Sequence, residues 1–160
     1  PGGLIRYAAA SYGVALNEGQ ARHVRERFFR AYPTLRAWHD TSRARSRAGA
    51  TEARTPLGRR RLIPAEASEW ERFTTLVNTP VQGGCADGMK VALQAVSGGL
   101  PPSACIVGTV HDEIIVEAGE GDADGVRAMV ETRMREAMQS VLPGVPIAVE
   151  TKVVEHWGAK

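Results

Sequence analysis

Three consecutive polar side chains, His111, Asp112 and Glu113, interrupt an otherwise apolar stretch. The flanking segments 104–110 and 113–118 are rich in Ile and Val, which predicts two strands joined by a short turn. A His-Asp pair is a poor choice for a tight hairpin, which prefers Asn-Gly or Asp-Gly. Adjacent carboxylates suit a hard cation such as Mg²⁺, which takes oxygen ligands from one or two carboxylates and from substrate phosphates. The pattern indicates a candidate phosphoryl-transfer site; a polar turn exposed to water is the alternative.

Asn78 and Gln82 form a second candidate site, because they are four residues apart and share one face of the helix expected over 66–96. Thr74 lies one turn earlier on the same face. A row of neutral amides can contact the hydrogen-bond acceptors that every base pair offers in the DNA minor groove. Amides that cap the irregularity around Pro80 are the alternative interpretation, and the two are compatible.

Basic residues are unevenly distributed along the chain. Residues 1–99 carry 15 Lys/Arg and 8 Asp/Glu, whereas residues 100–160 carry 5 and 10. Seven arginines fall between positions 43 and 61, and they include Arg59 and Arg60. Arginine suits bidentate phosphate contacts, so this half of the chain is a candidate polyanion-binding surface. A solvated helix face followed by a basic loop would explain the same charges.

The composition is that of an ordinary soluble globular protein, with 160 residues, 43% hydrophobic and 24% charged. No apolar run reaches the length of a membrane span and no signal-peptide pattern opens the chain, so we expect a cytoplasmic protein. Cys85 and Cys105 form no CxxC pair, which favours small buried thiols over a disulfide or zinc site. A chain that begins with Pro1 is expected to be processed or a piece of a longer one.

The expected fold class is α+β, with long helices and an antiparallel sheet. In chain order the predicted elements are a short helix ending near Gly13, a helix from Asn17 to about Gly49 that Pro33 kinks or splits, a hairpin or irregular loop over 51–64, a long helix over 66–96, strands over 104–110 and 113–118, an amphipathic helix over 121–142 and a strand over 146–157. Asn17 and Gln20 complete a capping-box pattern. The methionine stripe of the last helix is interpreted as core packing.

Several motifs together resemble the family A DNA polymerases of the bacterial DNA polymerase I type. The combination of "VNTPVQGGCADGMKVAL" and, about twenty residues later, "TVHDEIIVE" is specific, although each alone is weak. "TPLGRRR", "SYGVALNEGQARHVRERFFRAYPTLRAWH" and "VPIAVETKVVEHW" are similar to other segments of that family, in the right order. The resemblance covers essentially all 160 residues. It implies that residues 1–50 are the C-terminal part of the fingers subdomain and residues 51–160 a partial palm.

The resemblance also implies roles for single residues. Asp112 matches the catalytic, metal-binding aspartate, Glu113 matches its supporting carboxylate, and His111 matches a residue near the primer terminus. Gln82 and Asn78 match minor-groove contacts to primer-template DNA. The implied reaction is attack of a primer 3′-hydroxyl on the α-phosphate of a dNTP, with two Mg²⁺ ions in the complete enzyme.

The chain departs from the family pattern in ways that bear on activity. The family usually has an arginine where this chain has Thr74. The strand motif D-x-S-x-x-E, which holds the other metal-binding aspartate, is absent; residues 39–45 begin similarly but lack the glutamate. The lysine-bearing fingers helix is absent as well. We therefore expect the isolated chain not to polymerise DNA.

Two other classes of function remain open from the sequence. One is a non-catalytic DNA-binding or split-enzyme module that needs an N-terminal partner. The other is a Mg²⁺-dependent nuclease or phosphatase, which would need a second carboxylate cluster. The acids available for such a cluster are Glu117, Asp122 and Asp124, and their positions are typical of a strand end and a helix start.

Overall fold

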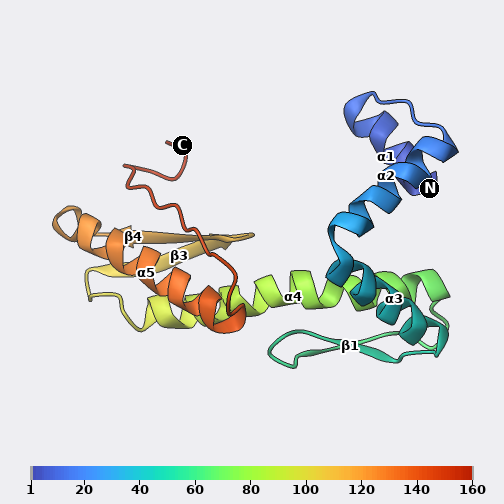
Figure 1. The fold of residues 1–160 in the computed structure, drawn as a ribbon. Coiled ribbons are helices and arrows are strands. Elements are labelled where there is room, and N and C mark those ends of the chain that lie inside the picture. The colour runs from blue at the N-terminus through green and yellow to red at the C-terminus, as the bar shows by residue number, and fades with distance from the viewer. Residues whose placement is uncertain (1, 160) are drawn as a thin grey trace. The chain divides into compact units, whose positions relative to one another are not determined.

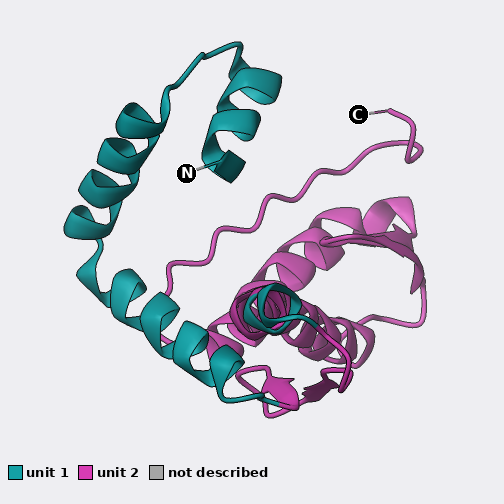
Figure 2. Cartoon of the chain, turned by 90° about the vertical axis from the view of Figure 1, so that its right-hand side faces the viewer, with its two compact units in different colours: residues 1–50, 68–73 teal, residues 51–67, 74–160 magenta. Residues whose placement is uncertain are grey.

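The computed structural model describes residues 2–159, which are drawn in Figure 1 and coloured by compact unit in Figure 2. Unit 1 contains the described residues up to position 50 and residues 68–73, and unit 2 contains residues 51–67 and those from position 74 onward. The elements in chain order are α1 (Gly2–Tyr12), α2 (Glu18–Ala31), α3 (Pro33–Arg47), β1 (Glu52–Arg54), β2 (Arg60–Leu62), α4 (Glu69–Ser97), β3 (Ala104–Val110), β4 (Glu113–Ala118), the short 3₁₀ helix η1 (Glu120–Asp122) and α5 (Ala123–Val141).

Local sequence signals set the helix boundaries of unit 1. The Asn17 side chain accepts a hydrogen bond from the Gln20 amide, and the Gln20 side chain accepts one from the Asn17 amide, so the predicted capping box is confirmed. Pro33 splits the following helix and occupies the first position of α3, where its missing N–H costs nothing. Gly13, with φ 64°, follows the end of α1.

Aromatic rings and small polar side chains pack α2 and α3 against the first turn of α4 within unit 1. The His39 ring lies 5.4 Å from the Phe29 ring and 5.6 Å from the Phe73 ring, measured between centroids. Burial, with the positive charges of Arg25 and Arg43, lowers the pKa of His39. Ser46 is 2% exposed, and its hydroxyl donates to the Glu69 carbonyl.

The core of unit 2 lies where α5 covers one face of the β3–β4 hairpin beside the last turns of α4 (Figure 1). Its buried residues are Val96, Val126 and Val130, against which residues of both strands and Met129 and Met134 pack. The prediction that the methionine stripe of α5 is core packing is confirmed. A buried hydrophobic face on one side of a two-stranded ladder fixes the register of that ladder.

Glycines let other segments approach α4 closely. A Cβ added at Gly83 would lie 2.4 Å from Thr55 Cγ2, in the loop between β1 and β2. A Cβ at Gly88 would lie 2.2 Å from Met138 Sδ of α5. These contacts explain why a helix of 29 residues keeps glycines that weaken it in isolation.

Two sequence-based expectations are wrong. Residues 146–157 form no strand within the described part of the chain, because a strand needs a neighbour for its backbone groups and β3 pairs only with β4 there. The segment instead contacts α5 through Thr151, whose Oγ1 lies 3.4 Å from Arg127 Nη1. Cys85 and Cys105 are exposed rather than buried; Cys105 occupies an outward position on β3, where exposure alternates along the strand.

The α+β fold class is confirmed, as long helices combine with the two-stranded antiparallel sheets β1–β2 and β3–β4. The predicted split into fingers (1–50) and palm (51–160) stays a prediction. Among the described residues, no helix is long and apolar enough to cross a membrane.

Candidate functional site

His111, Asp112 and Glu113 lie at the tip of the β3–β4 hairpin. Val110 pairs with Glu113, so His111 and Asp112 make a two-residue loop. His111 has φ 55°, the one positive φ of a non-glycine residue within residues 2–159. Such a conformation costs about 1 kcal/mol, although His tolerates it better than most residues. It turns the chain tightly enough to leave Asp112 exposed at the end of two strands.

A β-bulge lies in the strand that leads to this tip. Ile106 pairs with Val116 and Gly108 pairs with Ile115, so Val107 is the extra residue of β3. A bulge increases the local twist and changes the direction of the strand, and bulges are frequent beside active sites. The bulge and the packed core face of the hairpin therefore set the direction of the last residues of β3 and of the tip.

The exposed carboxylates of Asp112 and Glu113 have the donor chemistry that Mg²⁺ prefers. Mg²⁺ in nucleotide-processing sites takes one or two protein carboxylates and completes its shell with substrate phosphates and water. Among residues 2–159, no group of three or more His, Cys, Asp or Glu side chains is arranged around one point. The tip thus fits a shared Mg²⁺ site and not an all-protein cage.

The acids considered for a second carboxylate cluster do not join the tip. Asp122 ends η1, where its Oδ2 accepts a hydrogen bond of 2.5 Å from Ser103. Asp124 lies in the first turn of α5, with Oδ1 3.8 Å from Arg127 Nε. Glu117 is exposed on β4. The first two have local structural partners, which disfavours the hydrolase hypothesis.

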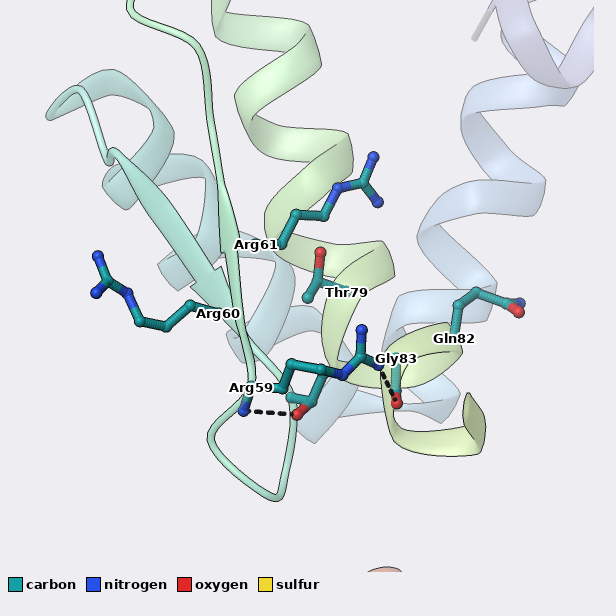
Figure 3. Close-up of a pocket in the computed structure, with 7 residues that line it drawn as sticks. Arg59, Arg60, Arg61, Thr79, Gln82 and Gly83 are labelled. Carbon is teal, nitrogen blue, oxygen red and sulfur yellow. Dashed lines mark hydrogen bonds between the residues drawn. The ribbon is translucent and has the colours of Figure 1, made fainter. Parts of the chain in front are cut away.

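The second candidate site lies on α4. Asn78 and Gln82 are both exposed on this helix, four residues apart as predicted. A pocket of about 180 Å³ lies between α4 and the β1–β2 hairpin; its lining residues are Thr55, Arg59, Arg60, Arg61, Thr79, Gln82 and Gly83. The Gln82 side chain points away from the arginines in Figure 3. The pocket lining contains three arginines and no acid.

The three consecutive arginines of this pocket have different surroundings. Arg59 donates from Nε to Asp87 Oδ1 at 2.7 Å and from Nη2 to the Gly83 carbonyl at 3.1 Å. Arg60 extends away from α4 in Figure 3, and its Nε lies 2.6 Å from Glu52 Oε2. Arg61 is exposed and makes no ion pair with the described part of the chain.

Asp87 is the buried partner of this group, with its side chain 5% exposed. Burial alone would raise the pKa of Asp87, but hydrogen bonds from Thr55 and Arg59 and the positive charges of Arg59 and Lys90 outweigh it. The net result is a pKa below the usual range of an aspartate. Asp87 is therefore a charged group inside the contact between hairpin and helix.

Residues 5–159 match DNA polymerase family A, which is nearly the whole chain. The chain belongs to DNA polymerase family A. The family resemblance of the sequence motifs is thus confirmed.

Two curated relatives illustrate the match. DNA polymerase I of Aquifex aeolicus is 34% identical over 159 residues, covering 97% of this chain and 26% of the relative. The thermostable DNA polymerase I of Thermus aquaticus is also 34% identical over 159 residues, covering 92% of this chain and 18% of the relative. The chain therefore spans about a quarter or less of the length of these relatives.

A solved structure agrees with the family assignment. The POL domain of Pol1 from M. smegmatis, in complex with DNA primer-template and dNTP, is 29% identical and superimposes with a TM-score of 0.64. The superposition covers 84% of this chain and 26% of that one. The likeness extends to three-dimensional structure and not to sequence alone.

Sequence reasoning did not find Asp87 and Thr55. It assigned Arg59 to DNA through its charge, whereas the structure pairs Arg59 with Asp87 and Gly83. One signal was present: Asp87 is an acid among small and apolar residues in "GGCADGMKVAL". An acid in such surroundings is rarely buried without a partner, and an arginine-rich loop is a natural source of one.

Proposed function

We propose that this chain supplies the catalytic carboxylate tip and the minor-groove helix of a DNA-directed DNA polymerase, which adds dNTPs to a primer 3′ end in DNA replication or repair. The main support is the exposed Asp112 at the β3–β4 tip of a chain that matches DNA polymerase family A over residues 5–159. The relative from M. smegmatis, solved with primer-template and dNTP, supports these two as partners.

In the proposed mechanism the β3–β4 hairpin and α4 hold the functional side chains in fixed positions. The paired strands and the bulge hold Asp112, with Glu113 beside it, where the primer end and the triphosphate meet. Asp112 would hold Mg²⁺, and such an ion would supply charge neutralisation for the attacking 3′-hydroxyl and for the leaving pyrophosphate. His111 lies beside the primer terminus. Gln82 and Asn78 donate hydrogen bonds to base acceptors in the minor groove.

We expect the residues of this chain not to suffice for catalysis on their own. The tip offers two adjacent carboxylates, and residues 2–159 bring no third metal ligand to it. In the proposed enzyme, a second metal-binding carboxylate and the dNTP-binding lysine that the family resemblance implies come from another part of the protein. The alternative is a non-catalytic DNA-binding or split-enzyme module that pairs with an N-terminal partner.

A chimera tests the proposed function directly. This chain would replace the matched segment of A. aeolicus DNA polymerase I, and templated primer extension would be measured. We expect extension, and Asp112→Asn should slow it by at least about 100-fold. The matched control is Glu117→Gln, which alters another exposed acid of the same hairpin and should leave the rate near that of the parent.

Two outcomes distinguish the proposals. A chimera that binds primer-template and extends it equally well with Asp112→Asn contradicts the catalytic assignment. If the free 160-residue chain is inactive but restores extension when the remainder of the A. aeolicus enzyme is added in trans, the split-module alternative is supported.

A further inference from the structure

The loop of the β1–β2 hairpin is attached to α4 through one arginine side chain. Arg59 Nε donates to Asp87 Oδ1 at 2.7 Å. Arg59 Nη2 donates to the Gly83 carbonyl at 3.1 Å, which is one of the dashed lines in Figure 3. The Arg59 amide donates to Thr55 Oγ1 at 3.1 Å, which fixes the loop that carries the guanidinium. One planar fork thus contacts a side chain and a main-chain carbonyl one helical turn apart on α4.

The surroundings make this contact specific. Asp87 is 5% exposed, so its charge depends on the partners it has there. Thr55 occupies the space that a side chain at position 83 would need, since an added Cβ would lie 2.4 Å from Thr55 Cγ2. The hairpin therefore reaches α4 where a glycine has left the helix backbone open.

Gln82 immediately precedes the carbonyl that Arg59 holds. Its own side chain is exposed and has several rotatable bonds, so its amide is placed only as accurately as the backbone beneath it. Pro80, two residues earlier, cannot donate the helix hydrogen bond to the Leu76 carbonyl, so the turn that precedes Gln82 is weakened. The hydrogen bond from Arg59 to the Gly83 carbonyl therefore adds an external contact to α4 directly after this weakened turn.

We propose that Arg59 and Asp87 are positioning residues, which hold the Gln82 turn of α4 in the orientation needed for minor-groove contact. The inference rests on the proposed function, because it assumes that Gln82 contacts DNA. It removes Arg59 from the phosphate-binding set and leaves Arg60 and Arg61 as the candidates of this loop.

The first part of the test needs no DNA. Hydrogen–deuterium exchange would be compared for peptides covering 81–88 and 104–110 in the 160-residue chain and its variants. Arg59→Lys keeps the charge but removes the planar fork whose two separate nitrogens contact Asp87 and Gly83. We expect it, and Asp87→Asn, to speed exchange in 81–88 by at least about fivefold and to leave 104–110 unchanged. Unchanged exchange in 81–88 would overturn the inference.

The second part uses DNA with one acceptor removed. Primer-template with 3-deazaguanine at the primer terminus lacks the minor-groove N3, and binding would be measured by fluorescence anisotropy. The wild-type chain is expected to favour normal DNA by about tenfold, and Gln82→Ala to reduce this preference to about onefold. Arg59→Lys and Asp87→Asn should reduce the preference below about twofold although Gln82 is intact.

Arg54→Lys is the matched control. Arg54 lies in the same hairpin and also contacts an acid and a carbonyl, Glu52 at 2.8 Å and Gly58 at 3.3 Å, but both partners are within the hairpin. The Arg54→Lys variant should keep the tenfold preference for normal DNA over the analogue. Asp87→Asn separates a positioning effect from a simple charge effect. Removing a negative charge near DNA would by itself strengthen binding to both DNAs, and it would not abolish the preference for normal DNA.

The outcomes distinguish the minor-groove role of Gln82 from the positioning role of Arg59 and Asp87. A wild-type chain that does not distinguish the analogue overturns the minor-groove role of Gln82, and the inference with it. A wild-type chain that distinguishes the analogue, with Arg59→Lys and Asp87→Asn doing so equally well, overturns the inference alone. Loss of discrimination in both variants, with Arg54→Lys unaffected, supports it.

Discussion

Arg59 Nε lies 2.7 Å from Oδ1 of Asp87, so a loop arginine and a helix carboxylate 28 residues later in the chain form one contact. This pair divides the adjacent arginines by role. Arg59 faces α4, Arg60 pairs with Glu52 inside the hairpin, and Arg61 is exposed. The three arginines carry the same charge and cannot be told apart by charge pattern, but their contacts in the structure differ.

Asp87→Asn should flatten the acid side of the stability profile. The pKa of Asp87 lies below its usual value of 3.8 in the folded chain, because the Thr55 and Arg59 hydrogen bonds outweigh burial. A depressed carboxyl pKa contributes stability above the unfolded-state pKa and loses it as pH falls through the folded-state pKa. Urea unfolding would be measured between about pH 7 and 3. Below about pH 4 the free energy of unfolding of the wild type should fall, and that of the variant should fall less.

At neutral pH the same substitution should lower the free energy of unfolding by about 1 to 2 kcal/mol, since Arg59 is half-exposed and keeps some solvation. Asp124→Asn is the control, because that side chain is 96% exposed and its removal should cost little stability at neutral pH. If the free energy of unfolding fell equally with acid pH in the wild type and in Asp87→Asn, the stabilising role of the buried ion pair would be contradicted.

Gly83→Ala should destabilise unit 2 although alanine is the better helix former. The new methyl would lie 2.4 Å from Thr55 Cγ2, and the stiff, β-branched threonine cannot move away without moving the hairpin loop. We expect a loss of about 1 to 3 kcal/mol by urea unfolding. Gly125→Ala in α5, where nothing lies within 4 Å of the added Cβ, should instead gain about 0.5 kcal/mol. Destabilisation of both by the same amount would argue against the packing explanation.

The sequence predicted features whose causes are local. Asn17 and Gln20 predicted a helix start, and Pro33 a helix break, because capping bonds and a missing N–H act within one turn. Two segments rich in Ile and Val predicted the β3–β4 hairpin, and His111 and Asp112 its tip.

Features that depend on distant partners were missed. The Arg59–Asp87 contact joins residues 28 apart, and no periodicity encodes it. The strand expected over 146–157 had the right residue types, but a strand forms only where another chain segment offers hydrogen bonds. Cys105 was expected to be buried from its residue type, whereas its position on the outer face of β3 exposes it.

Asn17→Ala should weaken the start of α2. The substitution removes the side-chain acceptor of the Gln20 amide, a hydrogen bond of 2.9 Å, and should cost about 1 kcal/mol in unit 1. Urea unfolding followed by circular dichroism measures this change. Asn17→Ser keeps an oxygen acceptor and should lose much less, so equal losses in the two variants would show that the cap does not stabilise the helix.

Arg61→Gln should reduce the salt dependence of primer-template binding. If the exposed Arg61 contacts one phosphate, it releases about one counterion, and the slope of log K against log salt concentration should become shallower by about 0.9. Fluorescence anisotropy between about 50 and 200 mM salt measures this slope.

Arg59→Lys serves as the comparison, because it keeps the charge and alters only the contacts with Asp87 and Gly83. Its salt slope should equal that of the wild type, while its discrimination of the minor-groove analogue falls. An unchanged slope in Arg61→Gln would place Arg61 outside the interface, because a residue that neutralises no phosphate releases no counterion.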